Sequence, residues 1–396
     1  MEQTTFFPDK GYDEFGMYFL DRGIRKICVV CGSSFKKLTV GKYVTDFFAA
    51  NDIDVVFFSD FQPNPDYESI VKGVEVFKKN ECDAILAVGG GSAMDVAKCI
   101  KLYATMPLGS DYINQKIEPN GIPFVAIPTT AGTGSEATRY AVIYYKGVKQ
   151  SITDSSCIPQ AVLFDPSVLD TLPDYQRKAT MLDAFCHAVE SFWSVNSTDE
   201  SKAYSKDAIR LILNNMESYL KNEYEGNKNM LLAANIAGKA LNITQTTAGH
   251  AMRYKLTSLY GISHGPAATL CVSELWPYMI ENTDKCIDSR GKEYLESVFK
   301  EVAKTMGEKF PLDAAAKFKN IVESLGLKAP EIKSEGDFEV LKKSVNPTRL
   351  KNNPVLLDED IINMLYHKIE KSRQTKLHGR GEHVQFYKNR CIHWTQ

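Results

Sequence analysis

The stretch AILAVGGGSAMDVAK, residues 84–98, decides the fold of this chain. Its apolar start at 84–88 has the length of a strand, three glycines follow, and a helical pattern opens at Ser92. Glycines let the backbone approach a ligand closely, and the first turn of a helix offers free N–H groups and a positive dipole end. We interpret the stretch as a phosphate-binding turn, although no glycine occupies the sixth position of the G-x-G-x-x-G fingerprint.

The same alternation of strand and helix continues on both sides of this turn. Apolar runs of strand length lie at 26–30, 54–58, 84–88 and 124–127, and helical spacing occupies 41–50, 67–79 and 92–103. This alternation predicts an α/β domain with a mostly parallel sheet. The short runs at 142–145, 151–152 and 161–164 predict further strands that continue the sheet, with an antiparallel pair among them.

The pattern changes at Asp165-Pro166, after which helical segments replace the strands. We therefore predict an α/β domain over residues 1–166 and an all-helical domain over 167–373. The remaining residues, 374–396, are basic and aromatic without clear periodicity, and we assign them no role. The predicted helices of the second domain are 177–193, 199–220, 228–247, 293–305 and 312–325.

Composition excludes several classes of function. Among 396 residues, 44% are hydrophobic and 24% charged, and the net charge is −2, so the chain has no basic footprint for nucleic acid. No apolar run reaches the roughly 18 to 20 residues that a membrane span needs, and the first ten residues do not resemble a signal peptide. We expect a cytoplasmic protein with nine reduced cysteines, in which Cys28 and Cys31 belong to a buried strand.

A second loop of small residues follows the strand at 124–127. It reads IPTTAGTGSE, residues 127–136, and packs hydroxyls and glycines after a strand end. In open α/β sheets, ligands bind at the carboxyl ends of the strands. Two loops suited to phosphate binding in one domain therefore predict a dinucleotide site.

A metal site is predicted in the helical half. Asp183 and His187 are four residues apart, so they share one face of a helix. His250 and His264 follow, separated by fourteen residues in which Gly261 indicates a helix end. One carboxylate and three imidazoles are a suitable ligand set for Fe²⁺ or Zn²⁺.

These motifs together resemble the iron-containing (group III) alcohol dehydrogenases, over roughly residues 20–370. The resemblance implies a Rossmann-like part, a helical part and a nicotinamide dinucleotide in the cleft between them. It implies metal ligands at Asp183, His187, His250 and His264, and a homodimer. It also implies that the cofactor is contacted by Gly89, Gly90, Gly91, Ser92, Asp95, Thr129, Thr130, Thr133 and Lys149.

Gly32 departs from the family pattern and bears on the choice of cofactor. Many members carry an aspartate at this position after the first strand, where it holds the ribose hydroxyls of NAD and repels a 2′-phosphate. Glycine removes the repulsion, and Ser33 beside it offers a hydroxyl. We therefore expect NADPH to be used, or both NADPH and NADH.

A second departure lies next to the third metal ligand. Typical members carry a histidine four residues after it, and this chain has Tyr254, flanked by Arg253 and Lys255. Cations close to a catalytic metal favour an anionic substrate, and arginine suits phosphonate oxygens. We assign these three residues to catalysis: Tyr254 in proton transfer, and Arg253, Lys255 or both in holding the anion.

The stretch 250–265 is most similar to the phosphonoacetaldehyde reductases of the family. The function that this resemblance implies is reduction of phosphonoacetaldehyde to 2-hydroxyethylphosphonate in phosphonate metabolism, with a small anionic aldehyde as substrate. The main rival function is that of a general short-chain aldehyde reductase or alcohol dehydrogenase with a neutral substrate. The sequence is also compatible with a lyase of the dehydroquinate synthase type and with a non-enzymatic assembly role, and the four candidate metal ligands favour neither.

Overall fold

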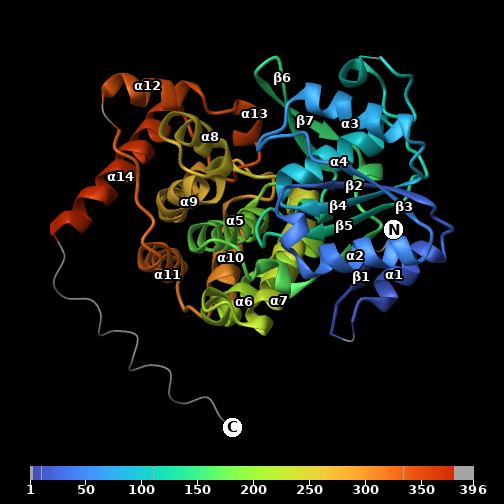
Figure 1. Cartoon of the computed structure of the whole chain (residues 1–396). Coiled ribbons are helices and arrows are strands. Elements are labelled where there is room, and N and C mark those ends of the chain that lie inside the picture. The colour runs from blue at the N-terminus through green and yellow to red at the C-terminus, as the bar shows by residue number, and fades with distance from the viewer. Residues whose placement is uncertain (1–2, 10, 110, 333, 379–396) are drawn as a thin grey trace, which may run out of the picture.

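The computed structural model describes residues 3–9, 11–109, 111–332 and 334–378, and divides them into a sheet-containing half and a helical half (Figure 1). The predicted basic tail falls mostly on residues 379–396, which lie outside the described residues. The last helix, α14 (Glu359–His378), includes the first residues of that predicted tail.

A parallel sheet of six strands forms the first half, in the order β1-β8-β5-β4-β2-β3. Helices α3 and α4 lie on one of its faces and α1 and α2 on the other (Figure 1). The predicted Rossmann-like class is therefore confirmed. The strands are β1 (Thr4–Phe6), β2 (Lys26–Cys31), β3 (Asp54–Phe58), β4 (Ala84–Gly89), β5 (Phe124–Pro128) and β8 (Ala161–Leu163); the helices are α1 (Asp13–Leu20), α2 (Thr39–Ala50), α3 (Tyr67–Lys79) and α4 (Gly91–Tyr103).

The sheet changes direction between β2 and β4. From β2 the chain adds β3 on one side, and from β4 it adds β5 on the other. At such a switch point the loops after neighbouring strands diverge and leave room for a ligand at their carboxyl ends. Both glycine-containing segments, at 32–33 and 89–91, follow these two strands.

Two predicted strands do not continue this sheet. β6 (Tyr140–Tyr145) and β7 (Val148–Thr153) form a separate antiparallel hairpin, so the prediction that both extend the main sheet is wrong. No residue of β7 is buried, whereas a strand inside a parallel sheet is covered on both faces. β8 does continue the sheet, between β5 and the strand β1, which the sequence pattern did not indicate.

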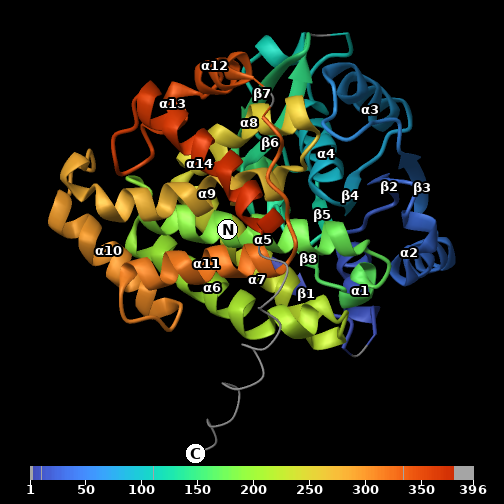
Figure 2. The same cartoon turned by 90° about the vertical axis from the view of Figure 1, so that its left-hand side faces the viewer.

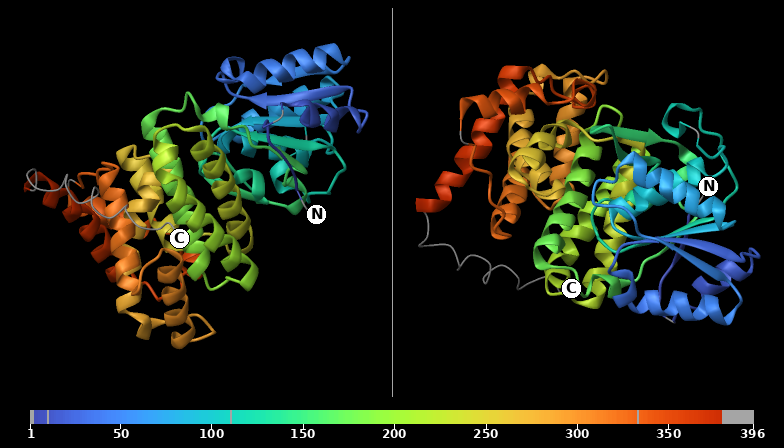
Figure 3. Two further views of the ribbon diagram at one scale, coloured as in Figure 1. Left: turned by 90° about the horizontal axis from the view of Figure 1, so that it is seen from below. Right: turned by 45° about the horizontal axis from the view of Figure 1, so that its top comes forward.

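The second half is helical, and no β-strand occurs in the described part of the chain after Leu163. Helix α5 lies against α6, α7 and α9, which Figures 2 and 3 show from several sides. The helices are α5 (Asp174–Trp193), α6 (Asp199–Leu220), α7 (Tyr224–Thr244), α8 (Ala248–Tyr260), α9 (His264–Glu281), α10 (Lys292–Thr305), α11 (Pro311–Ser324), α12 (Glu335–Lys343), α13 (Pro347–Leu350) and α14.

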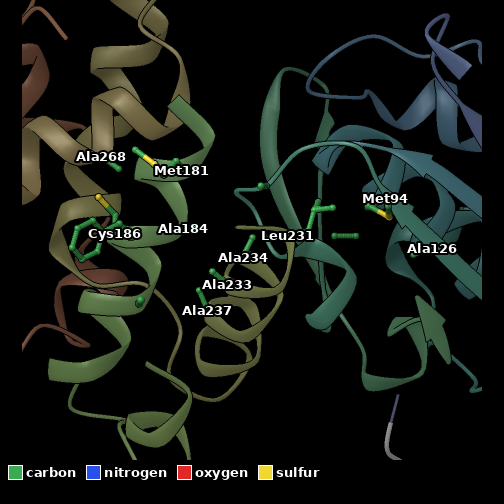
Figure 4. Packing of buried hydrophobic residues seen from close by; sticks show 14 of the residues in the cluster. Met94, Ala126, Met181, Ala184, Cys186, Leu231, Ala233, Ala234, Ala237 and Ala268 are labelled. Carbon is green, nitrogen blue, oxygen red and sulfur yellow. The ribbon is translucent and has the colours of Figure 1, made fainter. Parts of the chain in front are cut away.

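Small side chains let these helices approach one another. Figure 4 shows buried alanines of α5, α7 and α9, among them Ala184, Ala234 and Ala268. A backbone contact joins the two halves: Gly134, with a φ of 56°, packs directly against Gly238 in α7. A Cβ at either position would collide with the other backbone, so both must be glycine.

The cysteines are as expected. Cys28 and Cys31 are buried in β2, and the cysteines of the described chain are free. Within the described residues, none of the helices combines the length and the apolar character that crossing a membrane requires.

Candidate metal centre and cofactor loops

Three of the four predicted metal ligands come together in the helical half. Asp183 and His187 lie one turn apart on α5, and His250 lies on α8. One ligand atom from each lies within 4.8 Å of the others, and all three residues are buried. The two imidazole rings are stacked, with centroids 4.5 Å apart.

Each of these three residues has a buried polar atom without a hydrogen bond. Asp183 Oδ1, His187 Nδ1 and His250 Nε2 are buried and have no hydrogen-bond partner among the described residues. Buried polar atoms are nearly always partnered, because leaving them without a partner costs about 1–3 kcal/mol each. A metal ion such as Fe²⁺ or Zn²⁺ therefore fits these residues, since a carboxylate and imidazoles are ligands that both ions accept.

Glu190 orients the ring of His250. Its buried carboxylate contacts His250 Nδ1 and also accepts a 2.7 Å hydrogen bond from the Thr247 hydroxyl. A carboxylate on one ring nitrogen fixes the tautomer and leaves the other nitrogen for a metal. Glu190 was not predicted from the sequence, although it lies seven residues after Asp183 and therefore on the same face of α5.

The charge states of Asp183 and His187 suit metal binding. Burial lowers the pKa of His187 to about 4, so its ring is neutral at pH 7 and can act as a ligand. Burial opposes ionisation of Asp183, but the neighbouring His187 and His250 outweigh it and hold the pKa of this carboxyl well below its usual range. For His250, the charge of Glu190 outweighs burial and raises the pKa.

His264 is not part of this three-residue group. It begins α9, after α8 has ended at Tyr260 with the predicted turn at Gly261. Its Nε2 lies 3.1 Å from Asn64 Oδ1 in the sheet-containing half, and its Nδ1 contacts Arg253. Burial and Arg253 lower its pKa to about 4, so the ring is neutral. His264 as fourth ligand stays a prediction, and its contact with Asn64 was not predicted.

The predicted cofactor loops lie at one edge of the sheet. Cys31 pairs with Val88, and Gly89 pairs with Pro128, so residues 32–33, 89–92 and 129–133 all follow strand ends in register. A Cβ added at Gly90 would lie 3.2 Å from the Thr130 side chain. One added at Gly91 would lie 3.2 Å from Thr133. The two small-residue loops therefore face each other across the start of α4, with Ser92 in its first turn.

Two further predicted cofactor residues lie behind and beside these loops. Asp95, one turn into α4, lies 3.4 Å from the Ser135 hydroxyl, and burial raises its pKa to about 7. Lys149 lies on β7, and its Nζ is 5.8 Å from the ring centre of Tyr254. At Gly32 an added Cβ would meet no atom within 4 Å, and the neighbouring Ser33 is exposed.

Lys98 holds the second loop in place, which the sequence interpretation did not foresee. Its side chain is fully buried and donates hydrogen bonds of 2.6–2.8 Å to the carbonyl groups of Ser135, Thr138 and Tyr140. The only signal in the sequence is its place one turn after Asp95 in the helix that follows the glycines.

The three residues predicted for catalysis lie on α8 but differ in their surroundings. Arg253 contacts His264, and its Nε is buried without a hydrogen-bond partner in the described part of the chain. Tyr254 lies beside Tyr144, whose pKa is raised by burial and by this neighbour. Lys255, two residues after Arg253, points to another side of the helix and makes no hydrogen bond or ion pair with the described residues.

Comparisons with known proteins match both halves of the chain. Residues 3–166 match the family described as iron-containing alcohol dehydrogenase, and residues 178–369 match the C-terminal part of the same family. The 1,3-propanediol dehydrogenase of Citrobacter freundii is 36% identical over 276 residues, which cover 68% of this chain and 69% of that protein. Alcohol dehydrogenase 4 of Saccharomyces cerevisiae is 30% identical over 290 residues, covering 71% of this chain and 74% of that protein.

Solved structures agree with this match. The sulfoacetaldehyde reductase of Bifidobacterium kashiwanohense, solved with NAD⁺, superimposes with a TM-score of 0.83 at 25% identity, covering 93% of this chain and 97% of that chain. A 1,3-propanediol oxidoreductase structure superimposes with a TM-score of 0.80 at 28% identity, covering 92% and 97%.

Proposed function

The chain belongs to the iron-containing alcohol dehydrogenase family and is an NAD-dependent oxidoreductase of that type, and from this premise we propose that its substrate is a small anionic aldehyde. The proposed reaction is the reduction of phosphonoacetaldehyde to 2-hydroxyethylphosphonate. The observation that carries the proposal is Arg253, which contacts His264 beside the metal group while its Nε pairs with no described residue. The similarity to a reductase of sulfoacetaldehyde, which is also a small anionic aldehyde, supports it.

Each part of the site has a proposed task. Asp183, His187 and His250 would hold Fe²⁺ or Zn²⁺, with His264 as the fourth ligand. The ion supplies Lewis acidity toward a carbonyl oxygen, and the dinucleotide supplies the hydride. The two facing loops would orient the dinucleotide, with the first-turn N–H groups of α4 toward its pyrophosphate.

The remaining side chains act on charge and protons. The guanidinium of Arg253 would bind the phosphonate, because it offers paired donors to two oxygens at once. The hydroxyl of Tyr254, next to that of Tyr144, would pass a proton toward the developing alkoxide. The assignment of Lys255 to the anion, together with Arg253, stays a prediction.

We propose NADPH as the preferred form of the cofactor, with NADH as the alternative. A Cβ added at Gly32 would meet no atom within 4 Å, so a 2′-phosphate would find room after β2, and the exposed Ser33 hydroxyl would add a hydrogen-bond donor. The NAD⁺ bound to the similar reductase supports the alternative.

A neutral substrate is the second candidate function. The 36% identity to a 1,3-propanediol dehydrogenase favours it, because that protein is named for an uncharged diol. On this hypothesis the charge of Arg253 serves only to shape the surroundings of His264.

Turnover of matched aldehydes distinguishes the two functions. Protein reconstituted with Fe²⁺ is given NADPH or NADH with phosphonoacetaldehyde, sulfoacetaldehyde or propionaldehyde, and the loss of reduced cofactor is followed. Hydrogen bonds to charged groups contribute about 1.5–3 kcal/mol each, so we expect kcat/KM for the phosphonate to exceed that for propionaldehyde by about 100-fold. Equal turnover of propionaldehyde would establish the neutral-substrate function instead.

Three broader predictions accompany the proposal. We propose that the chain divides into an α/β domain, 1–166, and a helical domain, 167–373, and that it works as a cytoplasmic homodimer. Light scattering coupled to gel filtration should give about twice the 44.3 kDa mass of one chain.

A further inference from the structure

Three cationic side chains from distant parts of the chain lie close enough for their charges to act on one another. They are Lys149 on β7, Arg253 on α8 and Arg349 on α13. Helix α13 packs against α8, and the Arg349 guanidinium donates a hydrogen bond to the Thr246 hydroxyl, just before α8 begins. We call Lys149, Arg253 and Arg349 the cation triad.

The three charges are close enough to oppose one another. Burial, followed by the charges of Arg253 and Arg349, lowers the pKa of Lys149 to about 7. Burial and the charge of Arg253 likewise lower the pKa of Arg349. Positive charges that lie close together in a partly buried place destabilise the folded state unless a negatively charged group binds between them.

No carboxylate of the described chain forms an ion pair with a member of the triad. Asp183 and Glu190 are acids whose charges interact with Arg253 and Arg349 respectively, and both already approach His250. Asp95 acts on Lys149 more weakly than the two arginines do, and its own pKa is raised to about 7. A divalent ion at the metal group would add positive charge to this region.

We propose that the cation triad is the subsite for the tetrahedral oxyanion of the substrate, and that Arg349 is its specificity-determining residue. The inference rests on the proposed function and narrows it to aldehydes that carry a phosphonate or a sulfonate. Two guanidinium groups and an ammonium group can donate to all three oxygens of such a group. Arg349 is then a second arginine for the anion, beside Arg253.

The geometry explains why Arg349 rather than its neighbours would select the substrate. Arg253 contacts the predicted metal ligand His264, and Lys149 lies over the ring of Tyr254, the predicted proton donor. Both cations therefore also act where the aldehyde group would react. The hydrogen bond of Arg349 goes to Thr246, which is neither a predicted metal ligand nor a predicted cofactor residue. Its removal should therefore weaken binding of the oxyanion without removing a direct contact to the predicted metal ligands or to the cofactor residues.

The test uses Arg349→Met, Arg349→Lys and, as a matched control, Arg210→Met, which removes an exposed arginine from α6. The first measurement is kcat/KM of the Fe²⁺-loaded protein for phosphonoacetaldehyde, sulfoacetaldehyde and propionaldehyde. The second is calorimetric binding of methylphosphonate and methanesulfonate, and the third is fluorescence titration with NADH and NADPH.

We expect Arg349→Met to lose at least about 30-fold in kcat/KM for both oxyanion aldehydes and a similar factor in binding of the two oxyanions. Turnover of propionaldehyde and binding of the cofactor should change by less than about threefold, and Arg210→Met should match the wild type. Arg349→Lys keeps the charge without the paired donors and should lose about tenfold, so it decides the matter if Arg349→Met does not fold.

The remaining outcomes overturn the inference in distinguishable ways. An equal loss for all three aldehydes makes Arg349 structural, and a loss confined to NADH or NADPH assigns it to the cofactor. If the wild type prefers the oxyanion aldehydes and Arg349→Met keeps that preference, the inference fails and the proposed function stands. If the wild type shows no such preference, the proposed function fails, and an absence of methylphosphonate binding then overturns the inference as well.

Discussion

The carboxylate of Glu190 contacts Nδ1 of His250 and so turns the opposite nitrogen of that ring toward Asp183, whose Oδ1 lies 3.5 Å from His250 Nε2. The hydrogen bonds of Glu190 go to His250 and Thr247 and not to Asp183 or His187, yet they set the direction of one member of the metal group. The site therefore depends on a residue that would not itself bind the ion.

Replacing Glu190 with glutamine should weaken metal binding. The amide keeps the size of the side chain but loses the charge that fixes the His250 tautomer, and such changes typically cost about 10- to 100-fold in metal affinity. Competition with a chelating dye measures the affinity directly. Glu274→Gln is the control, since Glu274 is also a buried acid but pairs with Lys319 on α11. Wild-type affinity in Glu190→Gln would contradict the assigned role.

Replacing His264 with alanine tests whether it is the fourth ligand. We expect metal affinity to fall by at least about tenfold and turnover to disappear, because a three-residue site holds the ion less firmly. Asn64→Ala removes the partner of the Nε2 atom of this ring and should leave the metal affinity unchanged or higher. Full metal content and unchanged rates in His264→Ala would rule out His264 as a ligand.

The space beside Gly32 allows a test of cofactor preference. Aspartate fits there, because an added Cβ meets no atom within 4 Å, and its charge would repel a 2′-phosphate. Gly32→Asp should raise KM for NADPH by about tenfold or more while KM for NADH stays level or falls. Gly32→Asn, of the same size without the charge, is the control. A similar rise for both cofactors would mean that Gly32 does not discriminate between them.

Lys98→Met should destabilise the protein. Three carbonyl groups lose their donor in a buried place, and each such group costs about 1–3 kcal/mol, so we expect a loss of at least about 3 kcal/mol in the free energy of unfolding. Urea titration followed by circular dichroism measures it. Lys79→Met removes an exposed lysine of α3 and should change stability by less than about 0.5 kcal/mol. A comparably small change in Lys98→Met would contradict the structural role.

The lowered pKa of Lys149 makes stability depend on pH. With a pKa of about 7 in the fold and its usual 10.5 when unfolded, this lysine holds fewer protons in the folded state between those values. Stability should therefore rise with pH across that window, by up to about 1.4 kcal/mol per unit. The raised pKa of Asp95 acts below pH 7 and with the opposite sign, so it does not interfere.

Lys149→Met should flatten this rise, as measured by urea unfolding of the protein at pH 7.5, 8.5 and 9.5. Lys146→Met, on the exposed turn of the same hairpin, should keep the slope of the wild type. If Lys149→Met and the wild type show parallel slopes, the lysine is not perturbed by Arg253 and Arg349 in solution.

Much of the fold was predictable, because hydrophobic periodicity reports burial directly. The prediction of a helix over 199–220 matches α6 to the residue, and β3 and α3 have the predicted bounds. The hairpin β6–β7 was misplaced because alternation indicates a strand but not which sheet it joins. The three-residue strand β1 is too short to produce a pattern, and it forms only because β8 offers a parallel edge.

Residues that would themselves bind the metal ion could be predicted from the sequence. Residues that position another side chain or a loop were harder to predict. Asp183, His187 and His250 could be named from residue type and spacing, whereas Glu190 and Lys98 resemble ordinary charged helix residues in sequence. Their importance follows from what they touch, and those contacts join segments far apart in the chain. Arg349 follows Arg253 by nearly a hundred residues, so no local pattern links them.

The backbone contact between Gly134 and Gly238 has a consequence for how the molecule comes apart. Gly134 directly precedes Ser135, whose carbonyl group accepts a hydrogen bond from Lys98. Gly238 lies in the interior of α7. A polar side chain at either position would make the separated half more soluble, but its Cβ would collide with the backbone of the other half in the intact protein. Melting should therefore proceed cooperatively across the proposed domain border at residue 166, and either half produced alone would expose its side of this glycine contact to water.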